Sequence, residues 1–104
     1  MTAVLVYVTA SSREEAETIA RSVVGDRLAA CANILSDVTS YFWWEGGVQA
    51  EQEVSLILKS REHLVEPLTA KIKELHSYDC PCVVAVPISQ GNPDFLEWIA
   101  AETK

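Results

Sequence analysis

One short segment, residues 76–82 (His-Ser-Tyr-Asp-Cys-Pro-Cys), holds the densest group of side chains that could do chemistry. Imidazole and thiolate groups bind soft or borderline metal ions such as Cu(I) and Zn(II). In an extended chain, Cys80 and Cys82 lie on the same side, about 6.6 Å apart at ~3.3 Å per residue, which suits one ion between two thiolates. The segment therefore predicts a metal site of His76, Cys80 and Cys82, with two inert thiols as the alternative.

The remaining reactive side chains do not form a recognisable catalytic pattern. Cys31 and His76 could act as nucleophile and base, but no third orienting group accompanies them, and Cys31 lies among small residues typical of a packed strand. Glu45, Glu51 and Glu53 could bind a hard cation or act in acid–base chemistry, or could simply protect a sheet edge. There is no P-loop, G-x-G-x-x-G or H-E-x-x-H motif. We expect a protein that is not an enzyme, with no catalytic residues and no obligatory cofactor.

The elements that must position these groups follow from the hydrophobic pattern. Apolar runs predict strands at Ala3–Ala10, Leu28–Leu35, Glu53–Lys59 and Val83–Ile88, with an aromatic stretch at Tyr41–Trp44. Apolar residues at helical spacing predict helices over about 12–25, after Ser60 and after Asn92. The order is β-α-β-β-α-β plus a terminal helix. This order predicts an α+β fold of the ferredoxin-like kind, with the helices on one face of an antiparallel sheet.

Glycine, proline and helix-capping residues set the expected ends of these helices and strands. Gly25 is expected just past the first helix, and Gly46-Gly47 is expected to make the hairpin turn. Ser60 is expected to cap the second helix, and Asn92 with Pro93 to begin the last one. Pro87 cannot donate to a strand ladder, so it belongs at a strand end or on an edge strand.

The aromatic stretch carries the strongest indication of self-association. Side chains alternate across a strand, so Tyr41 and Trp43 point one way while Phe42 and Trp44 point the other. Helices on one face of the sheet cannot cover both sets. A second copy of the chain is the simplest cover, and we expect Trp43 or Trp44 at an interface between copies.

The overall composition bounds the class of protein. The chain of 104 residues suffices for one domain spanning 1–104. A net charge of −7 argues against a nucleic-acid partner, because a phosphate backbone requires a basic patch. No apolar run reaches the ~18 residues of a membrane span. Three cysteines, an odd number, do not form a disulfide framework, and with no signal-peptide pattern they predict a cytoplasmic protein.

A series of motifs occurs here in the order found in one known family. The motifs are Leu28-Ala29-Ala30-Cys31-Ala32-Asn33-Ile34, Ser40-Tyr41 leading to Trp44-Glu45-Gly46, Glu51 with Glu53-Val54, Lys59-Ser60, His76 and Tyr78 before Pro81, Val86-Pro87-Ile88, and Phe95-Leu96-Glu97-Trp98-Ile99. On these motifs the chain resembles the CutA family of divalent-cation tolerance proteins over nearly its whole length.

The resemblance implies a ferredoxin-like fold assembled as a compact homotrimer, similar in architecture to the nitrogen-regulatory PII proteins. It implies a cytoplasmic role in divalent-cation tolerance without enzymatic activity, with copper or another divalent metal as the ligand. The alternative is a PII-like small-molecule sensor with clefts between subunits, for which Trp44, Lys59, His76 and Tyr78 would converge on one cleft.

Four positions depart from the family pattern. Gly47 and Cys82 stand where the family usually has Lys and Glu, and Val8 and Leu75 stand where its copper-binding members have Cys and His. Of that copper set only His76 is present. Copper binding in this chain is therefore expected to depend on Cys80 and Cys82.

Overall fold

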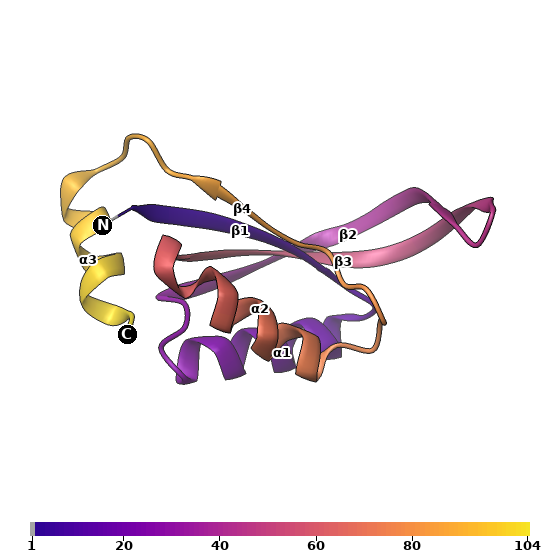
Figure 1. Ribbon diagram of the computed structural model, residues 1–104, viewed down its shortest axis with the longest axis horizontal. Coiled ribbons are helices and arrows are strands. Elements are labelled where there is room, and N and C mark those ends of the chain that lie inside the picture. The colour runs from indigo at the N-terminus through magenta and orange to yellow at the C-terminus, as the bar shows by residue number, and fades with distance from the viewer. Residues whose placement is uncertain (1) are drawn as a thin grey trace.

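The structure is a computed structural model that describes residues 2–104 (Figure 1). Its elements in chain order are β1 (Ala3–Ala10), α1 (Arg13–Gly25), β2 (Cys31–Trp44), β3 (Gly47–Arg61), a 3₁₀ turn (Glu62–Leu64), α2 (Val65–Leu75), β4 (Val83–Pro87) and α3 (Pro93–Glu102). The strands form one sheet in the order β2-β3-β1-β4, and each pair is antiparallel. This confirms the predicted α+β, ferredoxin-like class.

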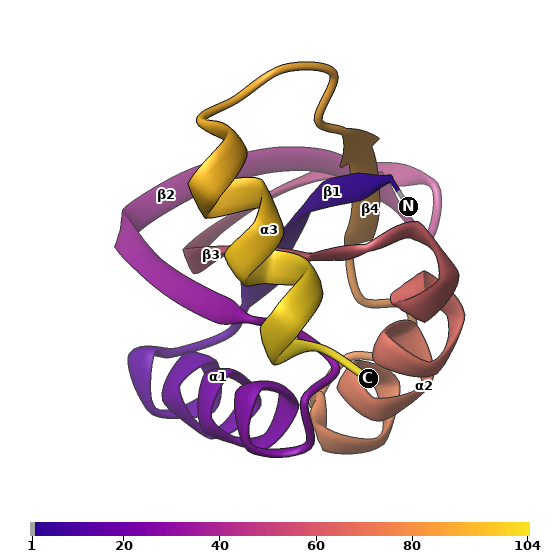
Figure 2. The ribbon, with the colours of Figure 1, turned by 90° about the vertical axis from the view of Figure 1, so that its left-hand side faces the viewer.

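The helices cover one face of this sheet and leave the other face open. Figure 1 shows α1 and α2 side by side beneath the strands, and Figure 2 shows α3 across the end of the sheet. The core lies between the sheet and the two helices, and its fully buried side chains include Val6, Val8, Ile19, Val23, Leu56, Leu58, Leu68 and Ile72. Each such large aliphatic side chain stabilises the fold by about 1.5–3 kcal/mol on burial.

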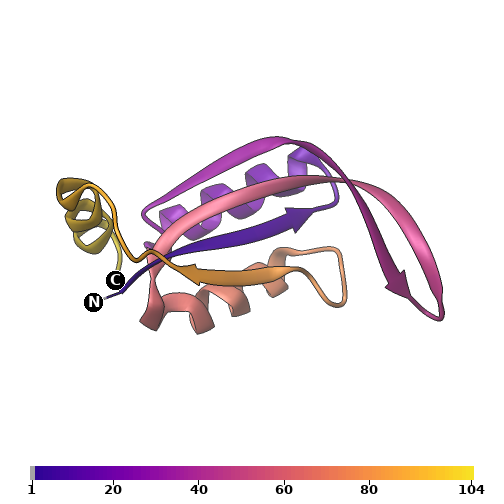
Figure 3. The same cartoon turned by 90° about the horizontal axis from the view of Figure 1, so that it is seen from above.

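β2 and β3 are much longer than β1 and β4, and the ends of β2 and β3 that extend beyond them form a two-stranded arm. β1 pairs with β3 only as far as Val54, so residues 38–53 pair only within the hairpin. The register of β2 against β3 shifts between Ile34 and Asp37, an irregularity of the kind that bends a strand. Figure 3 shows the arm curving back over the end of the sheet, towards the loop between α2 and β4.

The hairpin turn falls one residue earlier than predicted. Trp44 pairs with Gly47, so the two turn residues are Glu45 and Gly46, and Gly47 opens β3. Both turn residues have positive φ, 50° for Glu45 and 80° for Gly46. Two successive positive φ angles are those of a type I′ turn, whose twist matches that of the flanking strands.

The first helix ends differently from the prediction. Gly25 is its last helical residue, and the left-handed conformation falls instead on Arg27, with φ 59°. The Leu28 N–H donates to the Val23 carbonyl at 2.9 Å, and the Arg27 N–H donates to the Val24 carbonyl at 3.0 Å. This is a Schellman motif, which places Leu28 against the core and delays the start of β2 to Cys31.

Ser60 is not a helix cap, because β3 continues to Arg61 and a 3₁₀ turn precedes α2. Its buried hydroxyl donates to the Leu28 carbonyl at 2.6 Å and so ties β3 to the chain entering β2. The predicted cap of α3 is confirmed, and α1 has a side-chain cap of the same kind. The Ser12 hydroxyl accepts from the Glu15 N–H, and the Asn92 side chain accepts from the Asp94 N–H.

The outer strand β4 and helix α3 complete one side of the molecule. β4 ends at Pro87 and pairs only with β1, so the proline lies both at a strand end and on an edge strand, as expected. The end of α3 is held by two arginines. Arg61 donates to the Thr103 hydroxyl at 2.8 Å, and Arg27 donates to the Glu102 carboxylate at 3.0 Å.

Candidate functional site

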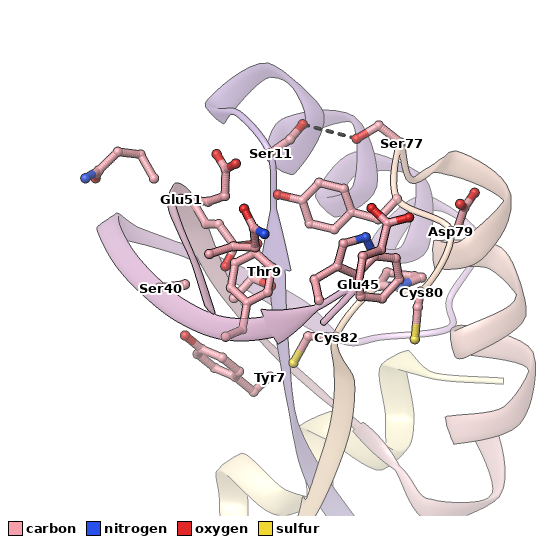
Figure 4. Close-up of a pocket in the computed structure, with 17 residues that line it drawn as sticks. Tyr7, Thr9, Ser11, Ser40, Glu45, Glu51, Ser77, Asp79, Cys80 and Cys82 are labelled. Carbon is pink, nitrogen blue, oxygen red and sulfur yellow. Dashed lines mark hydrogen bonds between the residues drawn. The ribbon is translucent and has the colours of Figure 1, made fainter. Parts of the chain in front are cut away.

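The curved arm and the loop 76–82 enclose a groove on the open face of the sheet (Figure 4). Its volume is about 950 Å³, within the range of small-molecule sites. The lining residues come from β1 (Tyr7, Thr9), the start of α1 (Ser11), the arm (Ser40, Phe42, Trp44, Glu45, Gln49, Glu51, Gln52, Glu53) and the loop (Ser77, Tyr78, Asp79, Cys80, Pro81, Cys82). We call this the arm groove.

The aromatic alternation predicted from the sequence produces one wall of the arm groove. Phe42 and Trp44 line it, whereas Tyr41 and Trp43 project from the opposite face of the arm and are each 75% exposed. Glu51 and Glu53, singled out as candidate charges, lie on the same wall because they pair with Ser40 and Val38. One strand therefore contributes to two distinct surfaces.

His76 anchors the loop from beneath the groove. Its side chain is fully buried, and its Nε2 lies 2.7 Å from the Thr9 carbonyl oxygen. The Tyr78 N–H donates to its Nδ1 at 3.1 Å. Because an amide can only donate and a carbonyl can only accept, these two contacts favour the tautomer that carries its proton on Nε2. Both ring nitrogens are thus occupied by the backbone.

Glu15 joins the same loop to the start of α1. Its carboxylate accepts from the Ser11 N–H at 2.8 Å and the Ser11 hydroxyl at 2.9 Å, and from the Ser77 N–H at 2.9 Å. Burial acts to raise the pKa of Glu15, but these hydrogen bonds outweigh it and bring the pKa below its ordinary value of 4.5. Nothing in the local sequence pointed to this contact between Glu15 and Ser77.

Tyr78 lines the groove close to three acidic residues. Its ring lies 4.6 Å, centroid to centroid, from the His76 ring. Burial, a hydrogen bond with Glu53 and the nearby charges of Glu53, Glu15 and Glu51 raise the pKa of Tyr78 to about 12. The phenol therefore remains protonated and serves as a hydrogen-bond donor at neutral pH.

The two thiols of the loop do not converge. Cys80 lies in a bend and is exposed, whereas Cys82 is half-buried at the entrance to β4. Figure 4 shows their two sulfur atoms apart, and the bend at Cys80 means that the extended geometry expected for 80–82 is wrong. Burial, together with the charge of Glu53, raises the pKa of the Cys82 thiol, which disfavours the thiolate that a metal requires.

Within residues 2–104, no group of three or more His, Cys, Asp or Glu side chains is arranged to hold a metal ion. His76, Cys80 and Cys82 are close in sequence, but both nitrogens of the imidazole are engaged by the backbone, and one thiol is exposed while the other is half-buried. The residues as they stand do not fit a copper centre in a single chain. Their role as metal ligands stays a prediction that requires the loop to rearrange.

The four residues proposed for a small-molecule cleft are divided by the fold. Trp44 and Tyr78 both line the arm groove, and His76 lies beneath it against Tyr78. Lys59 lies farther along the open face, where it pairs with Leu5 and donates to the Asn33 side chain. Cys31, expected in the core, is half-buried beside Lys59 on the same open face.

Comparison with known proteins places this geometry in a family. The sequence model described as CutA1 divalent ion tolerance protein matches residues 4–102. The chain belongs to the CutA1 family. It is 44% identical to Protein CutA 1, chloroplastic, of Oryza sativa subsp. japonica, over 97% of this chain and 57% of the rice protein. It is 42% identical to the divalent-cation tolerance protein CutA of Pyrococcus horikoshii, over 97% of this chain and 98% of that protein.

Solved structures of family members have the same fold. The divalent cation tolerance protein of Thermus thermophilus matches with a TM-score of 0.96 and 40% identity, over 98% of this chain and 99% of that one. The periplasmic divalent cation tolerance protein CutA of Archaeoglobus fulgidus matches with a TM-score of 0.94 and 40% identity, at the same coverage.

The cytoplasmic location predicted from the sequence is contradicted by this comparison, because the Archaeoglobus fulgidus protein is described as periplasmic. All three cysteines are free, yet a set of free thiols does not by itself assign a compartment. Among the described residues, no helix has the length and apolar character needed to cross a membrane.

Proposed function

We propose that this chain acts in divalent-cation tolerance as a non-enzymatic homotrimer, with the arm groove as its ligand site. The observation that carries the tolerance role is the CutA1 match over residues 4–102. The trimer follows from the family resemblance and is supported by surfaces that a single chain leaves uncovered.

The arm is the first of these surfaces. A two-stranded ribbon is marginally stable in water unless a third strand or another layer packs against it. Residues 38–53 have neither, and Tyr41, Trp43 and Val48 are all more than half exposed on the arm. Exposed aromatic side chains on a protruding element are typical of an interface between subunits.

The opposite side of the sheet offers a second surface. β4 is an edge strand with a free row of backbone donors and acceptors, and its Val84 and Val86 side chains are more than half exposed. Phe95 and Trp98 on α3 form a further exposed aromatic pair, with ring centroids 5.4 Å apart. Because one chain carries two different surfaces that favour association, a closed ring of copies is favoured over a simple dimer.

The groove supports binding rather than catalysis. Its two thiols have no basic partner, because the only nearby imidazole is buried with both nitrogens engaged. A thiol nucleophile is activated by an adjacent base, a lowered pKa or a metal ion, and the pKa of Cys82 is raised instead. We therefore propose no catalytic residue.

Copper is the proposed metal, with Cys80 and Cys82 as its ligands after movement of the loop. Thiolates prefer Cu(I) to hard divalent ions, and two thiolates are enough for a soft ion. The PII-like alternative, small-molecule sensing, is favoured by the groove itself, whose volume of about 950 Å³ exceeds the needs of a bare ion.

Two measurements test the proposal. Sedimentation equilibrium at micromolar concentration should give three times the mass of one chain, and the pair Tyr41→Ser and Trp43→Ser should dissociate it. The unaltered chain should restore growth on graded copper to cells that lack their own family member, and the dissociated variant should not. A stable monomer, or a monomeric variant with full tolerance, would contradict the trimeric mechanism.

A further inference from the structure

The charge of the arm groove is entirely negative. Four carboxyl groups line it, from Glu45, Glu51, Glu53 and Asp79, and no Lys, Arg or His side chain is among the lining residues. A cleft lined by one sign of charge concentrates ligands of the opposite sign and repels those of the same sign. This groove therefore disfavours nucleotides and other anionic metabolites.

Glu53 supplies an independent indication of a cation. The residue is only 8% exposed, and no Lys, Arg or His of residues 2–104 forms an ion pair with it. The neutral Tyr78 phenol forms a hydrogen bond with Glu53, and no buried side-chain nitrogen or oxygen of the described residues lacks a hydrogen-bond partner. A buried carboxylate whose neighbours are neutral gains further stabilisation from a positively charged ligand placed against it in the groove.

The arrangement of the carboxylates argues against a bare metal ion at this place. A hard divalent cation needs several oxygen ligands at about 2–2.6 Å from one point. Among the described residues no three acidic, His or Cys side chains are grouped in that way. The acidic groups instead surround a space of about 950 Å³, which suits a ligand with its own body.

The apolar side chains of the groove indicate the chemistry of the uncharged part of the ligand. Phe42 and Trp44 from the arm face the same space as Tyr7 of β1 and Tyr78 of the loop. Aromatic faces attract organic cations through the ring quadrupole and bury the hydrocarbon that carries the charge. Carboxylates and aromatic rings together form the recognition chemistry of an amine.

We propose that the arm groove binds a small organic cation, a primary amine or guanidinium with an apolar body, with its charged head at Glu53 and its body against Trp44. The inference rests on the ligand groove of the proposed function, and it requires neither copper binding nor a role in tolerance. It names a ligand class opposite in charge to that of a nucleotide.

Three probes of matched shape test it on the assembled protein at pH 7.4. They are 2-phenylethylamine, which is a cation, 3-phenylpropanoate, which is an anion, and 2-phenylethanol, which is neutral. Isothermal titration should show binding of the amine at least tenfold tighter than that of either other probe. In ¹H–¹⁵N NMR spectra the amine should shift the Trp44 indole signal and leave those of Trp43 and Trp98, which lie outside the groove.

Single-charge variants locate the head group. Glu53→Gln should weaken amine binding about tenfold or more, since a charge-assisted hydrogen bond is lost. Glu51→Gln, at an exposed position on the same wall, should also weaken amine binding, and it provides a second test if Glu53→Gln disturbs the fold. Glu97→Gln removes the same charge from the exposed surface of α3 and should leave the affinity unchanged.

Equal affinity for the amine and the anion, or equal loss of binding in the Glu97 control, would overturn the inference. So would the absence of binding by every probe to a protein that sediments as a trimer, because a neighbouring copy would then fill the groove. Binding of Zn²⁺ that depends on Glu51 and Glu53, without amine binding, would also overturn it. None of these results bears on tolerance in cells, which the growth test decides separately.

Discussion

Replacing His76 by Ala should destabilise the protein by about 3–5 kcal/mol. The substitution removes two hydrogen bonds, from Nε2 to the Thr9 carbonyl and from the Tyr78 N–H to Nδ1, each worth about 1 kcal/mol net. It also leaves those backbone groups without partners in a buried position, which adds about 1–3 kcal/mol. The midpoint of guanidinium unfolding should fall by roughly 1 M at a fixed protein concentration.

The control for this experiment is the only other histidine. His63 is exposed, and its Nε2 lies 3.0 Å from the Lys104 carbonyl oxygen. His63→Ala should cost less than about 1 kcal/mol. Hydrogen exchange of the Tyr78 amide should accelerate in the His76 variant alone. If His76→Ala unfolds at the parental midpoint yet loses Cu(I) binding, His76 is a metal ligand and the structural role assigned to it is wrong.

Three further predictions concern the loop and its anchor. Replacing Cys80 and Cys82 together by Ser should remove most Cu(I) binding, measured by competition with a chelator. Replacing Cys31, which lies outside the groove, by Ser should leave Cu(I) binding unchanged. If the double variant binds Cu(I) as tightly as the unaltered protein, the thiol site does not exist. Iodoacetamide should modify exposed Cys80 faster than half-buried Cys82, whose raised pKa disfavours the thiolate, and the reverse order by peptide mass spectrometry would contradict the geometry. Because the pKa of Glu15 is lowered on folding, its contribution to stability should be complete above its ordinary pKa of 4.5 and lost as the pH falls through the lower folded-state value. Acid unfolding of Glu15→Gln should lack this step, and an unchanged acid profile would show that Glu15 is not responsible.

Much of the fold could be predicted because local signals and the tertiary structure agree. Ala3–Ala10 is apolar on both faces and becomes a central strand with the predicted bounds. Asn92 and Pro93 begin α3 because cap and ring geometry act within one turn of helix. The prediction errors arise where a residue distant in the sequence determines the local conformation. Ser60 has the residue type of a helix cap, but its hydroxyl is taken by Leu28 from the chain entering β2.

The candidate site shows the same division. Alternation along the strand assigned Phe42 and Trp44 to one face, and that face became the groove wall. The spacing of Cys80 and Cys82 assumed an extended chain, whereas the loop bends because His76 and Glu15 hold it from below. Arg27 took the left-handed conformation expected of Gly25, since its guanidinium and carbonyl also hold the end of α3. None of these partners could be read from local sequence.

Because the long arm forms one wall of the groove, the formation of the groove should depend on protein concentration. One groove wall belongs to residues 38–53, which no third strand of the same chain supports. In a dilute solution of separate chains this wall should fluctuate while the core remains folded, since local stability follows local packing. Association of copies would hold the wall in place, and by linkage any ligand that prefers the closed wall would strengthen association in return. Protein concentration would then act on this binding site in the way that an effector acts on an allosteric one.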